Sequence, residues 1–410
     1  MNALLISIDT LRADHLGCYG YERPTSPALD RLCQDSVVFE QAIAQAPSTL
    51  HSHASIFTSL LPHHHGATWA GRTRLADECT TVTEVFQSGG YATGAFTGGG
   101  QMDRIFGLDQ GFDFYEQPGA KDFQEIVTPA TAWLGRPREN PFFLFLHTYE
   151  THHPYTPAPG YLELFEKSYD GDLPDEITVD LLKEINRKER ELADGDLEHI
   201  IDTYDAEIRS MDAALERLIA YLEDNDLYDD TMIVFTSDHG EEFGEHGKVG
   251  WHSHSLFDEL LRVPLVVKFP GQRHAGIRVE SQVSSIDIAP TLLKALGLEV
   301  PSQFDGRDLT GIADGSDAGK RVAISRMDRQ VGRDIDSVRT PDWKLYRNQL
   351  FDLDADPEEL WDTALNRPRV IEMLRGELVE AVDSREPCLG PQVVPTGATL
   401  DELKALGYLQ

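Results

Sequence analysis

Short apolar runs alternate with amphipathic stretches along this chain. Runs of this kind, rich in β-branched and aromatic residues, predict buried strands, and they begin at Ala3 (ALLISI), Pro141 (PFFLFLH), Thr231 (TMIVFTS) and Pro264 (PLVVKF). Before the third run, apolar residues recur at helical spacing from Ile208 to Leu222, which predicts a helix that packs on a sheet. Strands that alternate with helices predict an α/β fold, here an α/β/α sandwich around a mostly parallel sheet.

A second pattern begins after about Ile312. The Gly- and Asp-rich segment ADGSDAGK predicts a linker, and the runs RVAISR, DSVRT, WKLYRN and QLFDL predict a small antiparallel sheet followed by a helix. We therefore expect a large α/β domain over residues 1–315 and a small C-terminal α+β subdomain over residues 316–410. The highly charged stretch from about Asp170 to Glu198 predicts an exposed helical excursion or cap.

The composition is that of a globular protein with a strongly acidic balance. Hydrophobic residues make up 40% and charged residues 26%, and Asp plus Glu number 70 against 36 Lys plus Arg, for a formal net charge of −34. This charge would repel nucleic acid and anionic membranes, so we expect neither as a partner. The first apolar run lacks the basic residues and the length of a signal peptide or spanning helix. The cysteines show no paired or metal-binding spacing, which predicts reduced thiols in a cytoplasmic protein.

Several predicted strands end in side chains that bind metals or transfer protons. In an open α/β sheet, ligands bind beyond the carboxyl ends of the strands. The residues at or shortly after these ends are Asp9, His147, His152, His153, Asp238 and His239. A single acid after a strand is commonly only a helix cap, but three strand ends with such groups indicate a functional site.

Longer motifs resemble the sulfatase family of the alkaline phosphatase superfamily, in order and nearly end to end. They are SIDTLRADHLGCYGY, TLHSHASIFTSLLPHHHG, TSDHGEEFGEHG and SLFDELLRVPLVV, with weaker matches in DIAPTLL, FDLDADPEE and the closing LKALGYL. The resemblance implies an alkaline phosphatase/sulfatase-like sandwich and a metal-dependent ester hydrolase.

The resemblance also places Thr49 at the nucleophile. The family's motif is Cys or Ser, any residue, Pro, Ser and Arg, followed by a helix, and its Cys or Ser is oxidised to formylglycine. Here Thr49 holds the first place and His53 the place of the arginine. Threonine cannot become formylglycine, but its hydroxyl can attack directly, as in the similar Thr-nucleophile phosphodiesterases and phosphoethanolamine transferases. A bound metal and a helix N-terminus would activate this weak nucleophile. The alternative is that Thr49 only caps the helix.

For the metal, the resemblance implies Asp9, Asp238 and His239 as ligands, completed by Thr49. Sulfatases typically have a second Asp and an Asn, oxygen ligands that suit calcium, where this chain has Thr10 and His239. An imidazole beside carboxylates favours Mn²⁺ or Zn²⁺ over Ca²⁺. The alternative is that His239 is a structural histidine with a satisfied hydrogen bond.

Further histidines complete the candidate catalytic set. His152 matches the family histidine that contacts the ester oxygens or protonates the leaving group. His252 and His254 lie near the place of the family's active-site lysine, and one of them is a candidate general acid, a ligand of a second metal ion or a structural residue. His63 and His64 are predicted to lie on the surface, in a turn.

Other departures from the family argue against sulfate chemistry. Sulfatases often carry Gly-Lys-Trp-His where this chain puts Gly98 at the lysine and Gly100 at the histidine. With His53 at the arginine, three cationic or proton-donating groups are gone, and a phosphate ester attacked by a metal-bound alkoxide needs them less. We therefore predict hydrolysis of small-molecule phosphodiesters or phosphomonoesters. The alternatives are a sulfuric ester hydrolase with a different nucleophile, a phospho-group transferase, and a non-catalytic binding protein.

Overall fold

The computed structural model describes residues 1–70, 72–119, 121–166, 168–317, 321–328 and 334–408. Its main sheet has nine strands in the order β10-β2-β9-β6-β1-β5-β3-β4, with β11 also beside β2. These strands are β1 (Asn2–Ile8), β2 (Val37–Ile43), β3 (Ala92–Phe96), β4 (Phe114–Glu116), β5 (Phe142–Thr148), β6 (Thr231–Ser237), β9 (Arg262–Lys268), β10 (Ile277–Val279) and β11 (Val283–Ser284). The pairs are parallel except those of β9, which runs antiparallel to β2 and β6. The predicted strands and the mostly parallel sheet are confirmed.

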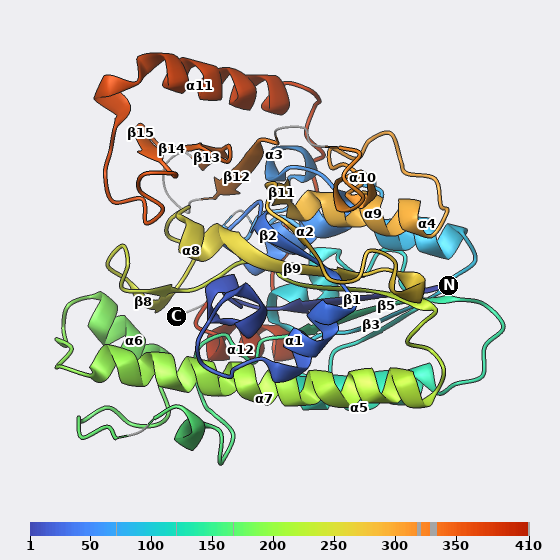
Figure 1. The fold of residues 1–410 in the computed structure, drawn as a ribbon, viewed down its shortest axis with the longest axis horizontal. Coiled ribbons are helices and arrows are strands. Elements are labelled where there is room, and N and C mark those ends of the chain that lie inside the picture. The colour runs from blue at the N-terminus through green and yellow to red at the C-terminus, as the bar shows by residue number, and fades with distance from the viewer. Residues whose placement is uncertain (71, 120, 167, 318–320, 329–333, 409–410) are drawn as a thin grey trace.

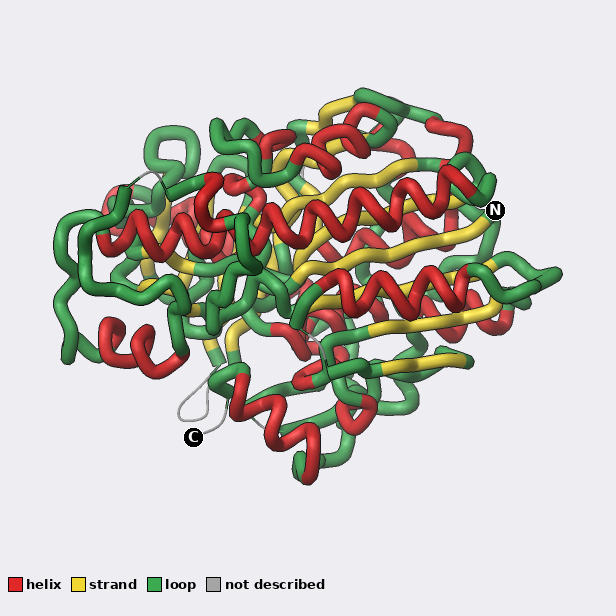
Figure 2. The backbone as a smooth tube through the Cα atoms, turned by 90° about the horizontal axis from the view of Figure 1, so that it is seen from below, coloured by secondary structure: helices red, strands yellow, loops and turns green. Residues whose placement is uncertain are grey.

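The sheet has a hydrophobic core on each face. Side chains alternate along a strand, so Ala3 and Leu5 of β1 face one core, and Leu4 and Ile6 face the other. The first core is covered by α2 (Thr49–Thr58), α4 (Val82–Ser88) and α9 (Ile288–Ala295), and the second by α1 (Pro27–Gln34), α5 (Phe123–Leu134) and α7 (Asp196–Asp224). Figure 1 shows α5 and α7 along one side of the sheet and α4 and α9 on the other. Figure 2 shows the long strands of the same sheet behind the helices of the second face. The predicted three-layer sandwich is therefore present, and α7 contains the helix predicted from Ile208 to Leu222.

A second sheet lies at the carboxy-terminal end, as predicted. It is antiparallel and contains β12 (Ala323–Met327), β13 (Ile335–Arg339), β14 (Trp343–Tyr346) and β15 (Gln349–Asp352). The predicted helix is α11 (Pro368–Val382), which buries Leu374 against this sheet. The predicted linker begins within α10 (Thr310–Ala313), and its residues 318–320 lie outside the described part of the chain. The domain boundary at residue 315 stays a prediction.

The chain does not end in the small subdomain. Its last helix, α12 (Gly397–Ala405), returns to the large unit, where Leu403 is fully buried in the core of the main sheet. The remaining elements are α3 (Pro62–His65), α6 (Val179–Asn186), α8 (Asp258–Leu261), and the hairpin of β7 (Glu242–Phe243) and β8 (Val249–Trp251). Within the described residues, the predicted excursion from Asp170 to Glu198 is mostly loop around the short α6. A search of those residues found no helix with the length and hydropathy needed to span a bilayer.

The predicted surface position of His63 and His64 is wrong. Both side chains are buried in α3. His63 Nε2 lies 2.9 Å from Asp336 Oδ1, and His64 Nδ1 lies 2.6 Å from Asp305 Oδ2. A local pattern of histidines after a proline gave no sign that distant segments of the chain cover this turn.

One buried carboxyl makes stability depend on pH. Glu150 accepts a hydrogen bond from the Phe123 amide at 2.8 Å, and burial raises its pKa from 4.5 to about 8. The folded state holds this proton more tightly, so the stability that it contributes is complete below pH 4.5 and is lost as the pH rises through about 8. At pH 8.5 we expect the free energy of unfolding of Glu150→Gln to exceed that of the wild type by up to about 5 kcal/mol, and this difference to shrink toward pH 4.5. A gap that is equal at both pH values would contradict this assignment.

Candidate active site

Three neighbouring strands bring the candidate groups to one edge of the main sheet. In the order β6-β1-β5, Ile8 of β1 pairs with Ser237 of β6 and with Thr148 of β5. The carboxyl ends of parallel neighbours meet at the same edge, so the side chains that follow them converge. Asp9 and Asp238 come directly after their strands. The strand-end prediction therefore holds as geometry.

The first cluster consists of Asp9, Asp238 and His239. Their ligand atoms lie within 4.8 Å of one another, and all three side chains are fully buried. His239 Nε2 is 3.6 Å from Asp238 Oδ2 and 4.0 Å from Asp9 Oδ1. Burial raises the pKa of both carboxyls, and for Asp238 the charge of Asp9 adds to the shift. Two acids and an imidazole are thus held together out of water.

The donor atoms of this cluster fit a divalent cation. Asp9 Oδ1, Asp238 Oδ2 and His239 Nε2 have no hydrogen-bond partner in the described structure. A buried polar atom left without a partner costs about 1–3 kcal/mol, so an occupant that satisfies several of them is favourable. His239 Nδ1 lies 3.0 Å from the carbonyl of Gly240, and a proton on Nδ1 that bonds to this carbonyl leaves Nε2 free to coordinate.

Thr49 is the first residue of α2 and adjoins this cluster. Its hydroxyl donates to Asp9 Oδ2 at 3.0 Å. The N-cap residue of α2 is Ser48. The Thr49 hydroxyl contacts Asp9 and the Tyr408 hydroxyl, and neither residue belongs to α2. The geometry therefore does not support a helix-capping role for Thr49.

His53 and His147 form a further buried group with Asp238, whose ligand atoms all lie within 4.8 Å of one another. His53 Nδ1 is 2.9 Å from the carbonyl of Thr49, and its Nε2 is 3.0 Å from Ser7 Oγ. His147 has no hydrogen-bond partner for either ring nitrogen among the described residues, and its Nε2 is 3.5 Å from Asp9 Oδ2. Burial lowers the pKa of both imidazoles to about 4, so each is neutral and offers a lone pair. The sequence places His147 at the end of a predicted strand but does not indicate that it faces the metal ligands.

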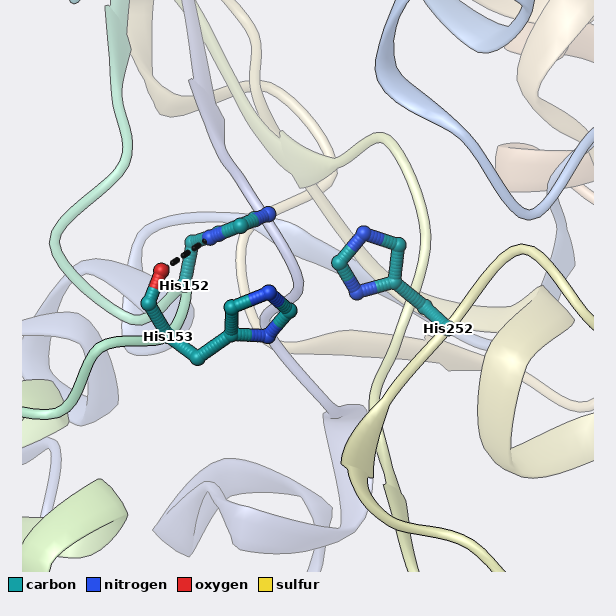
Figure 3. A group of neighbouring side chains, drawn as sticks. All are labelled: His152, His153 and His252. Carbon is teal, nitrogen blue, oxygen red and sulfur yellow. Dashed lines mark hydrogen bonds between the residues drawn. The ribbon is translucent and has the colours of Figure 1, made fainter. Parts of the chain in front are cut away.

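A second cluster consists of His152, His153 and His252, whose rings turn toward one another (Figure 3). Their ligand atoms lie within 4.8 Å, and all three are buried. His152 Nδ1 bonds to the carbonyl of His153, and His252 Nδ1 bonds to Glu241 Oε1 at 3.0 Å. Burial alone would raise the pKa of Glu241, but the imidazoles of His252 and His153 outweigh it and hold that pKa well below its usual range. The ring centroids of His252 and His239 are 4.7 Å apart, so the two clusters adjoin.

Two further residues, His254 and Tyr408, lie near these clusters. His254 is not a member of the three-histidine cluster, and its Nε2 lies 2.6 Å from Glu242 Oε2. Tyr408, which sequence analysis missed, places its hydroxyl 3.0 Å from Thr49 Oγ1 and 3.0 Å from His152 Nε2. The sequence carried one signal for it, the weak family match in LKALGYL.

A cavity of about 540 Å³ opens beside these groups. Its lining includes Trp69, Trp251, His254, Arg347 and Tyr408. The lining also includes His153 and His252 of the three-histidine cluster. Two indole rings and a guanidinium beside these imidazoles suit a small organic ester with an anionic group.

The sequence profile of the family described as Sulfatase matches residues 1–298. The chain belongs to the sulfatase family. A second profile, described as N-sulphoglucosamine sulphohydrolase, C-terminal, matches residues 244–384 of this sulfatase-family chain. The resemblance found in the sequence motifs is thus confirmed at the level of the family.

Curated relatives of this sulfatase-family protein include enzymes with different names. The multifunctional alkaline phosphatase superfamily protein PehA of Trinickia caryophylli is 29% identical over 400 residues, which cover 75% of this chain and 76% of the relative. The N-acetylglucosamine-6-O-sulfatase of Bacteroides thetaiotaomicron is 24% identical over 461 residues, covering 88% and 82%. The phosphonate monoester hydrolase of Agrobacterium radiobacter has the same fold, with a TM-score of 0.78, 22% identity, and coverage of 93% and 95%.

These comparisons establish a sulfatase-family hydrolase. The similar proteins include a sulfatase and a phosphonate monoester hydrolase, so the choice between sulfur and phosphorus stays a prediction. The family membership also supports a divalent metal ion, whose identity stays a prediction.

Proposed function

We propose that this sulfatase-family hydrolase cleaves small phosphate esters, phosphodiesters or phosphomonoesters, by direct attack of the Thr49 hydroxyl. The observation that supports this proposal most directly is the position of that hydroxyl. It lies at the start of α2, 3.0 Å from Oδ2 of Asp9 in the cluster of Asp9, Asp238 and His239. A threonine cannot supply the formylglycine of sulfatases, but its alcohol can attack the substrate directly.

A single divalent ion would be held by Asp9, Thr49, Asp238 and His239. The imidazole of His239, with His147 as a further nitrogen donor beside Asp9, favours Mn²⁺ or Zn²⁺ over Ca²⁺. When bound, the ion lowers the pKa of a coordinated hydroxyl and offsets the negative charge of the ester.

The protein's own groups carry the reaction in two steps. In the first, the bond from Thr49 Oγ1 to phosphorus forms while the bond to the leaving oxygen breaks. An imidazole of His152 or His252 takes up the hydroxyl proton of Thr49 and gives a proton to the leaving oxygen. In the second, water attacks phosphorus and the imidazole takes a proton from the water, while the bond from phosphorus to Thr49 Oγ1 breaks and Oγ1 regains its proton from the imidazole. His53, bonded to the Thr49 carbonyl and to Ser7, acts as a positioning residue. His254 lines the cavity and stays a candidate for contact with the organic group.

A second metal ion is the alternative occupant of the three-histidine cluster. His152 and His252 each bond through Nδ1 to an acceptor, as metal-binding histidines do, and Glu241 supplies negative charge. His152 Nε2 is, however, engaged by the Tyr408 hydroxyl, which favours a proton-transfer role for it. Two metal equivalents per chain would support the alternative, and one equivalent would support the proposal.

The choice of reacting centre can be measured with a matched pair of esters. We expect the 4-nitrophenyl phosphate ester to be turned over about 100-fold faster than 4-nitrophenyl sulfate. Sulfate transfer would need the formylglycine of sulfatases and the polar side chains that they carry at the positions of Gly98 and Gly100, and this chain lacks them. The comparison measures kcat/KM for both esters, with Thr49→Ala as the blank for contaminating enzymes. A faster sulfate ester would reverse this ranking, and transfer to an added alcohol in place of water would identify a transferase.

A further inference from the structure

The carboxy-terminal segment, residues 397–408, enters the active site from a distant part of the sequence. The Gly100 amide donates to Glu402 Oε2 at 2.8 Å, and Thr399 Oγ1 donates to Asp103 Oδ2 at 2.7 Å. These bonds fix α12 against the turn that follows β3. The chain then reverses at Gly407, with φ of 81°, and the Tyr408 amide donates to the Leu403 carbonyl at 2.9 Å. The segment is therefore docked at several points before it reaches the site.

Glycines make the space that this segment occupies. A Cβ atom on Gly99 would lie 2.3 Å from Glu402 Oε2, and one on Gly100 would lie 2.8 Å from Leu406 Cδ1. Both glycines also have positive φ values. A side chain at either position would therefore be disfavoured by the backbone conformation as well as by the lack of space. The carboxy-terminal segment therefore occupies the space that side chains at positions 99 and 100 would take.

Tyr408 brings a hydrogen-bond donor to that place. Its ring packs edge-on against Trp69, with centroids 5.7 Å apart. Its hydroxyl lies within 3.0 Å of Thr49 Oγ1 and of His152 Nε2. A phenol with its usual pKa of about 10 keeps its proton at neutral pH. The phenol has one proton. When His152 Nε2 is protonated and donates to the Tyr408 oxygen, this proton faces Thr49 Oγ1, the oxygen that forms and breaks the bond to phosphorus.

We propose that Tyr408 is a catalytic residue whose hydroxyl donates a hydrogen bond to Thr49 Oγ1, and that the carboxy-terminal segment thereby replaces polar groups missing at Gly98 and Gly100. This inference rests on the proposed role of Thr49 as nucleophile. The donor acts most strongly in the second step, when Oγ1 leaves phosphorus and gains negative charge. In the first step Oγ1 loses charge as it attacks, so the same bond accelerates that step less.

The test compares Tyr408→Phe with Tyr228→Phe. Phenylalanine keeps the ring that packs on Trp69, and Tyr228 is a matched control because its hydroxyl bonds to Asp35 Oδ2 at 2.9 Å, near the opposite end of β6. With a 4-nitrophenyl phosphate ester, we expect Tyr408→Phe to lower kcat about 100-fold. Mass spectrometry of acid-quenched enzyme should show a larger fraction of phosphorylated Thr49 than in the wild type. Tyr228→Phe should match the wild type in both measurements.

The adduct fraction separates a catalytic role from a structural one, because loosened packing would slow both steps and leave no excess of adduct. Glu402→Ala, which removes the acceptor for the Gly100 amide, should lower kcat in the same direction by undocking α12. If the wild type forms the Thr49 adduct and Tyr408→Phe matches it in kcat and in adduct, the inference is overturned and the nucleophile stands. If the wild type turns over the ester without any Thr49 adduct, both are overturned.

Discussion

Replacing Thr49 with alanine is expected to reduce turnover of a phosphate ester by about 10⁴-fold or more, the scale of loss when a covalent nucleophile is deleted. The hydroxyl is the group that would bond to phosphorus, and it already contacts Asp9 at 3.0 Å. Thr49→Ser keeps an alcohol at the same place and should retain a large part of the activity. The measurement is kcat with an aryl phosphate ester, together with mass spectrometry to locate the phosphoryl group on the peptide that contains Thr49.

Stability cannot account for such a loss. Thr49→Ala removes the hydrogen bond to Asp9, which costs about 1 kcal/mol. The helix loses no cap, because the N-cap of α2 is Ser48. The variant should therefore fold, and its thermal unfolding should lie within a few degrees of the wild type. A folded Thr49→Ala protein with full turnover would refute the covalent mechanism and leave water as the attacking group.

The parts of the site that follow strands could be predicted from the sequence. Asp9 and Asp238 stand directly after apolar runs, and the rule for parallel sheets places both at one edge. The role of His147 is harder to predict, because it lies in a continuous apolar run whose pattern does not indicate which side chains face the site. The run of β9 likewise gave no sign that this strand is antiparallel to its neighbours, since both faces of the sheet are buried.

The parts that depend on long-range packing could not be predicted. Tyr408 is 359 positions from Thr49 in the sequence, and no local periodicity connects them. Glu241 looked like one acid among many, yet its two oxygens approach two histidines of the second cluster. From the sequence, Gly98 and Gly100 are places of missing polar groups, whereas the structure shows that Gly100 and its neighbour Gly99 leave room for Glu402 and Leu406 of the carboxy-terminal segment.

Removal of the metal ion is expected to abolish most of the activity and to lower stability. The purified protein should carry about one equivalent of Mn²⁺ or Zn²⁺, and either ion, but not Ca²⁺, should restore turnover after chelation. Without an ion, Asp9 and Asp238 remain buried next to each other with unpartnered oxygens, so the chelated protein should also unfold at a lower temperature.

His239, which would bind the ion through its imidazole, allows a direct test of the metal site. Its Nε2 is unpartnered among the described side chains and lies 3.6 Å from Asp238 Oδ2, so His239→Ala should lower both the bound metal and turnover, the latter by about 10²-fold or more. His274→Ala is the matched control, because that ring packs on Phe269, away from both clusters. Elemental analysis and kcat are measured on the same preparations. Calcium alone in the active protein would contradict the assignment of Mn²⁺ or Zn²⁺. Unchanged metal content and turnover in His239→Ala would show that His239 is structural, because removal of a ligand weakens the binding of the ion.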